Sequence, residues 1–187
     1  MSLLESITKG KENKPPRLLI YGTEGVGKST YAANAPNPIF IQTEDGLDEI
    51  STAKFPLAHS LNDVLNALAA LRDEQHDFRT VVLDSADWLE RLIWDKVCQD
   101  FGVRSIEKAD GGYGKGYVHA LAYWRQIVSL LNNLRNVRGM IVIVDIEEHQ
   151  AVPSSLRYVV TSRQRCRAAF RAASSVALAK EARRNLL

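Results

Sequence analysis

The chain has 187 residues, of which 45% are hydrophobic and 25% charged, a composition typical of one soluble globular domain. Its two cysteines, Cys98 and Cys166, lie far apart, and its four histidines show no metal-ligand spacing, so we expect neither a disulfide framework nor a structural metal site. No apolar run approaches the roughly 18 residues that span a bilayer, and the N-terminus lacks the apolar core of a signal peptide. These features exclude membrane, collagen-like, disordered and disulfide-rich classes and favour a reducing cytoplasm.

The net charge of +2 hides an uneven distribution along the chain. Residues 1–149 contain 16 Lys or Arg against 21 Asp or Glu, whereas residues 150–187 contain 8 against 1. We therefore expect three parts: a polar leader over 1–16 that ends in two prolines, a folded core over 17–149, and a basic C-terminal segment over 150–187 whose fold is uncertain.

Short apolar runs alternate with segments of helical periodicity through the core. The runs that predict buried strands are 17–21, 38–42, 80–84 and 139–144. The segments that predict helices are 28–35, 61–72, 88–99 and 118–134. Because the strands are apolar throughout and alternate with helices, the pattern predicts an α/β fold, a mainly parallel sheet with helices on both faces.

Two stretches depart from this alternation. The glycine-rich stretch 110–116 should be a loop. Beyond residue 150, Tyr158–Thr161 could form a further strand, and 163–187 is an Ala/Arg-rich helical stretch without a clean apolar stripe. The fold could therefore be incomplete at the C-terminus.

The first strand is followed by a phosphate-binding motif. The sequence from Gly22 to Ser29 matches G-x-x-x-x-G-K-[ST], with a strand before it and a helix after it, as the motif requires. Backbone amides of such a loop surround phosphate oxygens, the lysine reaches the β- and γ-phosphates, and the serine hydroxyl binds Mg²⁺. The expected nucleotide-binding residues are Gly22, Thr23, Glu24, Gly25, Val26, Gly27, Lys28, Ser29 and Thr30.

Two carboxylates are candidates for the chemistry at the phosphates. Asp84 ends the strand 80–84, where P-loop NTPases place a second metal-site residue, although an aspartate there could simply cap the next helix. Glu44 follows the strand 38–42, at the edge where such sheets bind ligands, and could polarise an attacking water. Asp45, Asp48 and Glu49 crowd beside it, so position alone does not select Glu44.

Together these segments resemble the RecA-like recombinase ATPases. Within that superfamily, 20–29, 83–90 and 112–117 are most similar to short phage nucleotide-binding proteins of the single-strand annealing type, over about residues 15–144. The resemblance implies a cytoplasmic, phage- or prophage-encoded ATPase that uses ATP and Mg²⁺, binds single-stranded DNA in recombination or annealing, and self-associates. It also implies that Glu44, with Lys28, is catalytic and that Ser29 and Asp84 hold the metal.

The sequence departs from this family in two places. A polar sensor residue, His or Gln, is expected after the fourth strand. Here Asp145 lies near that place and His149 is displaced, so either could substitute or the sensor could be absent. The family's closing strands and DNA loop are not recognisable after Gln150, which divergence, truncation or a reading-frame shift would explain.

Tyr113, Lys115 and Tyr117, in the glycine-rich stretch, are candidates for contact with DNA or with a neighbouring subunit, and a plain surface turn is the alternative. The arginines of the basic segment could neutralise DNA phosphates or form a solvated helix. Trp88, Trp94 and Trp124 are expected in the core or packed between helices. Alternative functions are a small-molecule P-loop kinase and an ATP-binding clamp without hydrolysis; a GTPase is disfavoured because no N/T-K-x-D stretch follows the fourth strand.

Overall fold

The computed structural model describes residues 13–147 and 157–160, together with residues 4, 7, 9 and 10 of the leader. Its centre is a six-stranded sheet with the order β3-β2-β4-β5-β1-β6. The strands are β1 (Arg17–Gly22), β2 (Pro38–Gln42), β3 (Ala53–Lys54), β4 (Thr80–Asp84), β5 (Ile141–Glu147) and β6 (Arg157–Val160). Every pairing is parallel except that of β1 with β6. The predicted α/β class with a mainly parallel sheet is confirmed.

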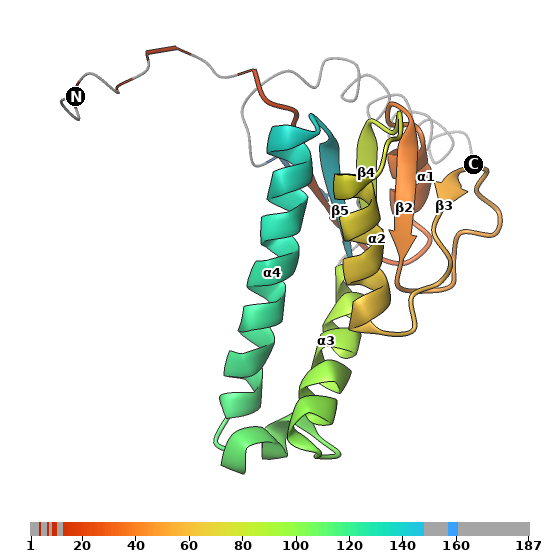
Figure 1. The fold of residues 1–187 in the computed structure, drawn as a ribbon. Helices are drawn as coiled ribbons and strands as arrows, with labels where there is room; N and C mark the ends of the chain where they lie inside the picture. Colours follow the sequence, from red (N-terminus) through yellow and green to blue (C-terminus); the bar gives the residue numbers. More distant parts are fainter. Residues whose placement is uncertain (1–3, 5–6, 8, 11–12, 148–156, 161–187) are drawn as a thin grey trace.

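Helices cover both faces of this sheet (Figure 1). They are α1 (Lys28–Ala33), α2 (Leu61–Asp73), α3 (Ala86–Phe101), the 3₁₀ helix η2 (Ile106–Gly111) and α4 (Lys115–Val137). Side chains of a strand alternate between the faces: Ile39 and Ile41 pack in the core under α2, α3 and α4, whereas Phe40 packs in the core under α1. Because both faces are buried, the strands can be apolar at successive positions, which is the pattern that the sequence displays.

The predicted strands and helices agree with the observed ones to within a few residues, and two short elements were not predicted. These are β3, an edge strand of two exposed residues, and η2. The expected loop over 110–116 is wrong at its end, because α4 begins at Lys115. Its start agrees with the backbone, since Asp110 is non-helical although η2 runs to Gly111, and all five residues from Asp110 to Gly114 have positive φ, which turns the chain.

Helices α3 and α4 form a hairpin that extends past the sheet (Figure 1). Helix α3 starts directly after the carboxyl end of β4 and has 16 residues, so it carries the chain about 24 Å away from that edge. Helix α4 then returns to the opposite end of the sheet, where β5 begins. The predicted strand over 158–161 is largely confirmed by β6, and the predicted helical stretch over 163–187 lies outside the described residues.

Candidate functional site

The phosphate-binding motif forms the connection between β1 and α1. Strand β1 ends at Gly22 and α1 begins at Lys28, so the predicted strand–loop–helix context is present. Gly25 and Gly27 have φ values of 70° and 97°, a conformation that a side chain would disfavour. Their positions in the motif therefore have a backbone reason, since this left-handed path turns successive amide groups toward one side of the loop.

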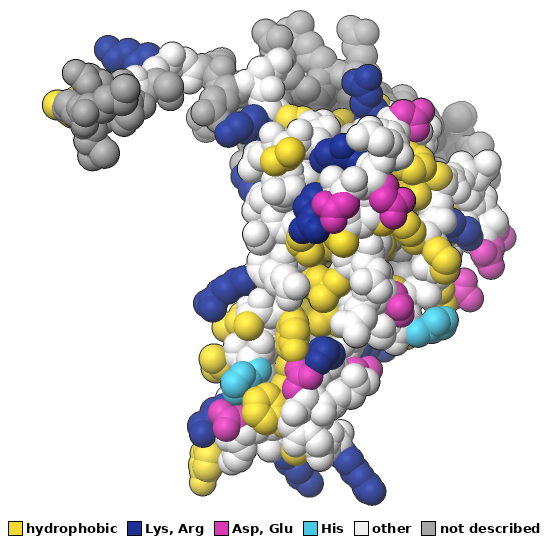
Figure 2. Space-filling view, viewed as in Figure 1, with side chains coloured by type: hydrophobic (Ala, Val, Ile, Leu, Met, Phe, Trp, Pro, Cys, Tyr) yellow, Lys and Arg dark blue, Asp and Glu magenta, His cyan; other side chains and the backbone are white. Residues whose placement is uncertain are grey.

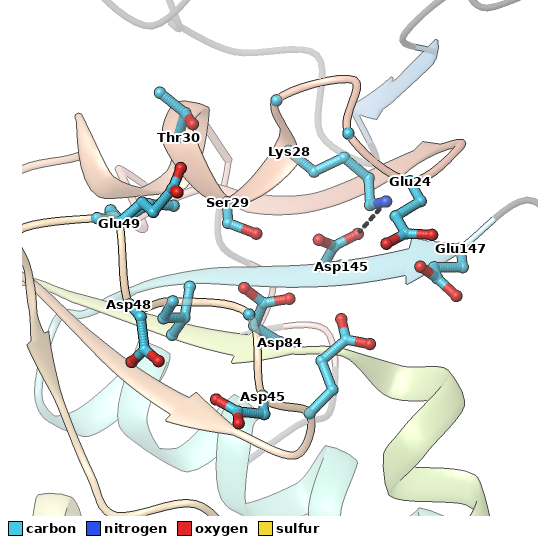
Figure 3. A pocket seen from close by; sticks show the side chains of 16 residues that line it. Glu24, Lys28, Ser29, Thr30, Asp45, Asp48, Glu49, Asp84, Asp145 and Glu147 are labelled. Carbon is cyan, nitrogen blue, oxygen red and sulfur yellow. Dashed lines mark ion pairs between the residues drawn. The ribbon is translucent and has the colours of Figure 1, made fainter.

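Lys28 is folded back under this loop. Its side chain is buried, and its Nζ donates to the carbonyl oxygens of Gly22, at 3.0 Å, and Thr23, at 3.3 Å. The same ammonium group lies 3.8 Å from Oδ1 of Asp145 (Figure 3). Two backbone carbonyls and one carboxylate thus hold the Lys28 ammonium group close to the loop, where it could contact an anion bound there.

Asp84 and Asp145 end up side by side at the carboxyl edge of the sheet. Leu83 of β4 pairs with Val144 of β5, and each aspartate is the next residue on its strand. Burial raises the pKa of Asp84, while the nearby Ser29 hydroxyl lowers it. Burial and the Asp84 carboxylate raise the pKa of Asp145 to about 8, against a partial lowering by Lys28. Asp145 was noted in the sequence only as a substitute sensor; the structure places it inside the site.

Glu44 is held next to Asp84 by hydrogen bonds of the preceding residue. The Thr43 amide donates to the carbonyl of Asp84, at 2.7 Å, and its hydroxyl donates to the carbonyl of Ser85, at 2.6 Å. The amide of Ser85 donates to the same hydroxyl, at 2.9 Å. Burial raises the pKa of the half-buried Glu44, and the carboxylates of Asp84 and Glu147 raise it further. This bridge between β2 and β4 selects Glu44 as the acid that faces Asp84.

Glu147, at the end of β5, is a site residue that sequence reasoning missed. Its amide donates to Oδ2 of Asp87 at 2.7 Å, which joins the end of β5 to the first turn of α3. Its side chain lines the same cavity as Glu44 and Asp84. No local sequence pattern indicates this position. The register of β5 against β1 pairs Glu147 with Gly22 and so places Glu147 beside the phosphate loop.

These groups line one cavity of about 620 Å³ (Figure 3). Lys28 is the only cationic side chain among the described residues of its wall. The wall carries eight carboxylates, from Glu24, Glu44, Asp45, Asp48, Glu49, Asp84, Asp145 and Glu147. A site this anionic attracts a phosphate ester only together with a cation.

The residues expected to hold Mg²⁺ fit such an ion. Oδ1 of Asp84 is buried without a hydrogen-bond partner, and the Ser29 hydroxyl lies beside the same carboxylate. Oxygen donors of this kind, with water and nucleotide phosphates completing the shell, are what Mg²⁺ prefers. No cluster of three or more His, Cys, Asp or Glu arranged for a metal ion occurs in the part of the chain that the structure describes.

The candidate DNA-contact residues lie away from this cavity, at the far end of the α3–α4 hairpin. Tyr113 is fully exposed. The Lys115 ammonium instead donates to the carbonyl of Asp110, at 3.2 Å, and Tyr117 packs edge-on against Trp94. All three side chains reach solvent, and Tyr113 is the one that makes no contact limiting its exposure.

Two other expectations concern surface and core. Trp94 and Trp124 pack against the core as expected, but Trp88 is 40% exposed with the Arg91 guanidinium stacked over its ring at 4.2 Å. The expectation for Trp88 was wrong because it lies on the outer side of α3, beside the buried Leu89. Over the described part of the chain, no helix has the length and apolarity to cross a bilayer.

Comparison with known proteins shows the family. The chain is similar to the SPbeta prophage-derived uncharacterized protein YorG of Bacillus subtilis (strain 168), with 23% identity over 129 residues. The alignment covers 67% of this chain and 39% of that relative, so the chain spans about two fifths of the relative's length. The family model described as an AAA domain matches residues 14–181, past residue 144 where the motif resemblance fades and into the basic segment. With the phosphate loop at the edge of a parallel sheet, this match shows that the chain belongs to the AAA-domain family of P-loop ATPases.

Proposed function

We propose that the protein is a Mg²⁺-dependent ATPase that acts on single-stranded DNA in phage recombination or strand annealing. The observation that carries the ATPase part is the convergence of the phosphate loop, Asp84 and Glu44 on one cavity. The AAA-domain match supports nucleotide binding by the same loop. The prophage origin stated in the relative's name supports placing the protein in the cytoplasm of a bacterial host.

Each group in the cavity has a role that its position supports. The loop amides and the Lys28 ammonium would bind the β- and γ-phosphates, and Ser29 and Asp84 would hold Mg²⁺, which neutralises charge on the phosphates when bound. Glu44 would orient the attacking water, because its carboxylate borders the cavity beside Asp84. Phosphoryl transfer requires mainly such positioning and charge neutralisation.

The single-stranded DNA part is supported by the hairpin. Its far end presents Tyr113, fully exposed and able to stack on a base. The connection between α3 and α4 also carries the exposed cations Arg104 and Lys108, next to the exposed acids Glu107 and Asp110; blue and magenta side chains are mixed at this end of the molecule (Figure 2). An exposed aromatic ring with cations nearby is the combination that sequence-independent binding of single strands uses. Since α3 separates this end from the sheet edge by about 24 Å, the DNA and the nucleotide would occupy different parts of one subunit.

The test is ATP hydrolysis by the purified chain, with and without single-stranded DNA. We expect DNA to stimulate hydrolysis and Glu44→Gln to abolish it while ATP still binds. Glu49→Gln is the matched control, because Glu49 lines the same cavity but is exposed, and it should hydrolyse ATP like wild type. Lys28→Ala should lose ATP binding, and Tyr113→Ala should weaken the stimulation by DNA.

Other outcomes of this test would replace the proposal. ATP binding without hydrolysis would identify a nucleotide clamp, and phosphate transfer to a nucleoside or metabolite would identify a small-molecule kinase. Hydrolysis that DNA does not change would leave an ATPase whose partner is not single-stranded DNA. Wild-type turnover in Glu44→Gln would remove Glu44 from the mechanism.

A further inference from the structure

Two buried carboxylates meet where β4 and β5 end. Asp84 and Asp145 follow the paired residues Leu83 and Val144 on adjacent parallel strands, whose backbones lie about 4.8 Å apart. Both residues are 3% exposed. Figure 3 shows the two carboxylates facing the same space between the phosphate loop and the sheet.

This pair lacks enough positive charge around it. Oδ1 of Asp84 and Oδ1 of Asp145 are both buried without a hydrogen-bond partner. The nearest cation is Lys28, whose Nζ lies 3.8 Å from Oδ1 of Asp145 and directs hydrogen bonds to two backbone carbonyls instead. When both groups are ionised, the one shared ammonium group leaves negative charge uncompensated, which is costly for side chains that are almost completely removed from water.

The donors around the pair match a hard divalent cation. They are carboxylate oxygens and the hydroxyl of Ser29, which lies close to Asp84, and they border a cavity large enough for water. Mg²⁺ is usually bound by one or two carboxylates and several waters, so two carboxylates suffice where a larger cluster is absent. Nitrogen and sulfur ligands, which zinc or copper would select, do not line this cavity among the described residues.

We propose that Asp84 and Asp145 together bind a divalent cation of the Mg²⁺ class in the nucleotide-free protein, with Lys28 as the competing positive charge. The cation would occupy the site before the nucleotide and would release Lys28 from Asp145 toward the incoming phosphates. This makes Asp145 a metal ligand from β5, in addition to the expected ligands on α1 and β4. The proposal relies on the proposed function for the use of the cavity but not on hydrolysis or on DNA.

The test is titration of the nucleotide-free protein with Mn²⁺, followed by the electron paramagnetic resonance of the free ion. We expect one site in the wild type, weakened by about ten- to a hundredfold in Asp145→Asn and in Asp84→Asn. Asp48→Asn is the matched control: it removes the same charge from the same cavity, but its side chain is 83% exposed and paired with Lys54. Its affinity for Mn²⁺ should change by less than about threefold.

Lys28→Ala supplies an independent arm. If Lys28 competes with the cation, its removal should tighten Mn²⁺ binding by more than about tenfold, although the same variant loses nucleotide binding. A residue that only supported the fold would not produce opposite changes in the two affinities. Asparagine has nearly the shape of aspartate, so Asp145→Asn should fold; if it does not, the Lys28→Ala titration decides.

Three results would overturn the proposal. The first is a wild-type protein that binds no Mn²⁺ at millimolar concentration, which is expected if the two carboxyl groups share a proton. The second is an Asp145→Asn protein that binds Mn²⁺ as tightly as the wild type. The third is a Lys28→Ala protein that binds Mn²⁺ no more tightly than the wild type. The proposed function is tested separately by hydrolysis. DNA-stimulated hydrolysis with unchanged Mn²⁺ binding in Asp145→Asn would refute this site alone, and the expected Mn²⁺ affinities without hydrolysis would refute the ATPase alone.

Discussion

Asp145→Asn should change how the stability of the free protein depends on pH. In the folded chain the pKa of Asp145 is raised from 3.8 to about 8, first by burial and then by Asp84. The folded state therefore binds this proton more tightly than the unfolded state does. Between these two pKa values folding is coupled to proton uptake, so the free energy of unfolding of the wild type should fall as the pH rises.

The magnitude follows from the size of the shift. Each tenfold change in proton affinity corresponds to about 1.4 kcal/mol, so a rise of the pKa from 3.8 to about 8 is worth on the order of 5 kcal/mol. Between about pH 5.5 and about pH 8 the wild type should lose about 3 kcal/mol of this contribution. Asparagine has no proton to take up, so the variant should match the wild type below about pH 4, where Asp145 is protonated in both states. It should exceed the wild-type stability by about 2 kcal/mol at pH 5.5 and by about 5 kcal/mol at pH 8.

The assay is urea unfolding followed by tryptophan fluorescence at several pH values, with EDTA present to keep divalent cations away from the carboxylates. Asp48→Asn, whose side chain is 83% exposed, is the control and should follow the wild-type pH dependence. Parallel stability curves for the wild type and Asp145→Asn would refute the reasoning. They would mean that Asp145 is neither desolvated nor close to Asp84 in the folded protein.

Three further results are expected. A Cβ on Gly116 would collide with the carbonyl oxygen of Ile106, because α4 packs closely on η2 at this point. Gly116→Ala should therefore lower the unfolding free energy by about 1–3 kcal/mol in urea melts, and wild-type stability would contradict this close packing. Thr43→Val leaves the buried amide of Ser85 unpaired, while the Ser85 carbonyl keeps its bond from the Leu89 amide, so the variant should lose about 1–3 kcal/mol of stability. Thr52→Val, at a buried hydroxyl without a partner, should be neutral, and equal costs would argue against the bridge. Because the cavity wall is strongly anionic, EDTA should abolish ATP binding in a fluorescence or calorimetric titration, and metal-free binding of equal affinity would show that the carboxylates do not face the phosphates.

Much of the fold and part of the candidate site could be predicted from the sequence because their signals are local. Apolar runs and helical periodicity located the main strands and helices, since each pattern reflects which side of one element is buried. The phosphate loop is one contiguous stretch whose conformation depends on its own glycines, so its position needed no tertiary information. The placement of Asp84 was predictable for the same reason: it ends a strand that follows the loop in the expected order.

The exposed side of α3 and the length of the α3–α4 hairpin were harder to predict from the sequence. Helical periodicity identified the apolar face of α3 but did not place the Trp88 ring outside it, because tryptophan is compatible with core and surface. The glycine-rich stretch was recognised as a break between helices. Its distance from the phosphate loop depends on the direction in which α3 leaves the sheet, and no local pattern encodes that direction.

The composition of the candidate site at the carboxyl edge of the sheet required the tertiary structure. The sequence by itself determined an α/β domain with a phosphate loop and a strand-terminal carboxylate. Only strand pairing decided that Asp145 would lie beside Asp84 and Lys28, because the order β4-β5-β1 and the pairing of Leu83 with Val144 join residues about 60 and 120 positions apart in the chain. The physical reason is that the charge and burial of a side chain at this edge depend on residues of the neighbouring strands. The periodicity of one strand contains no information about which strands lie next to it.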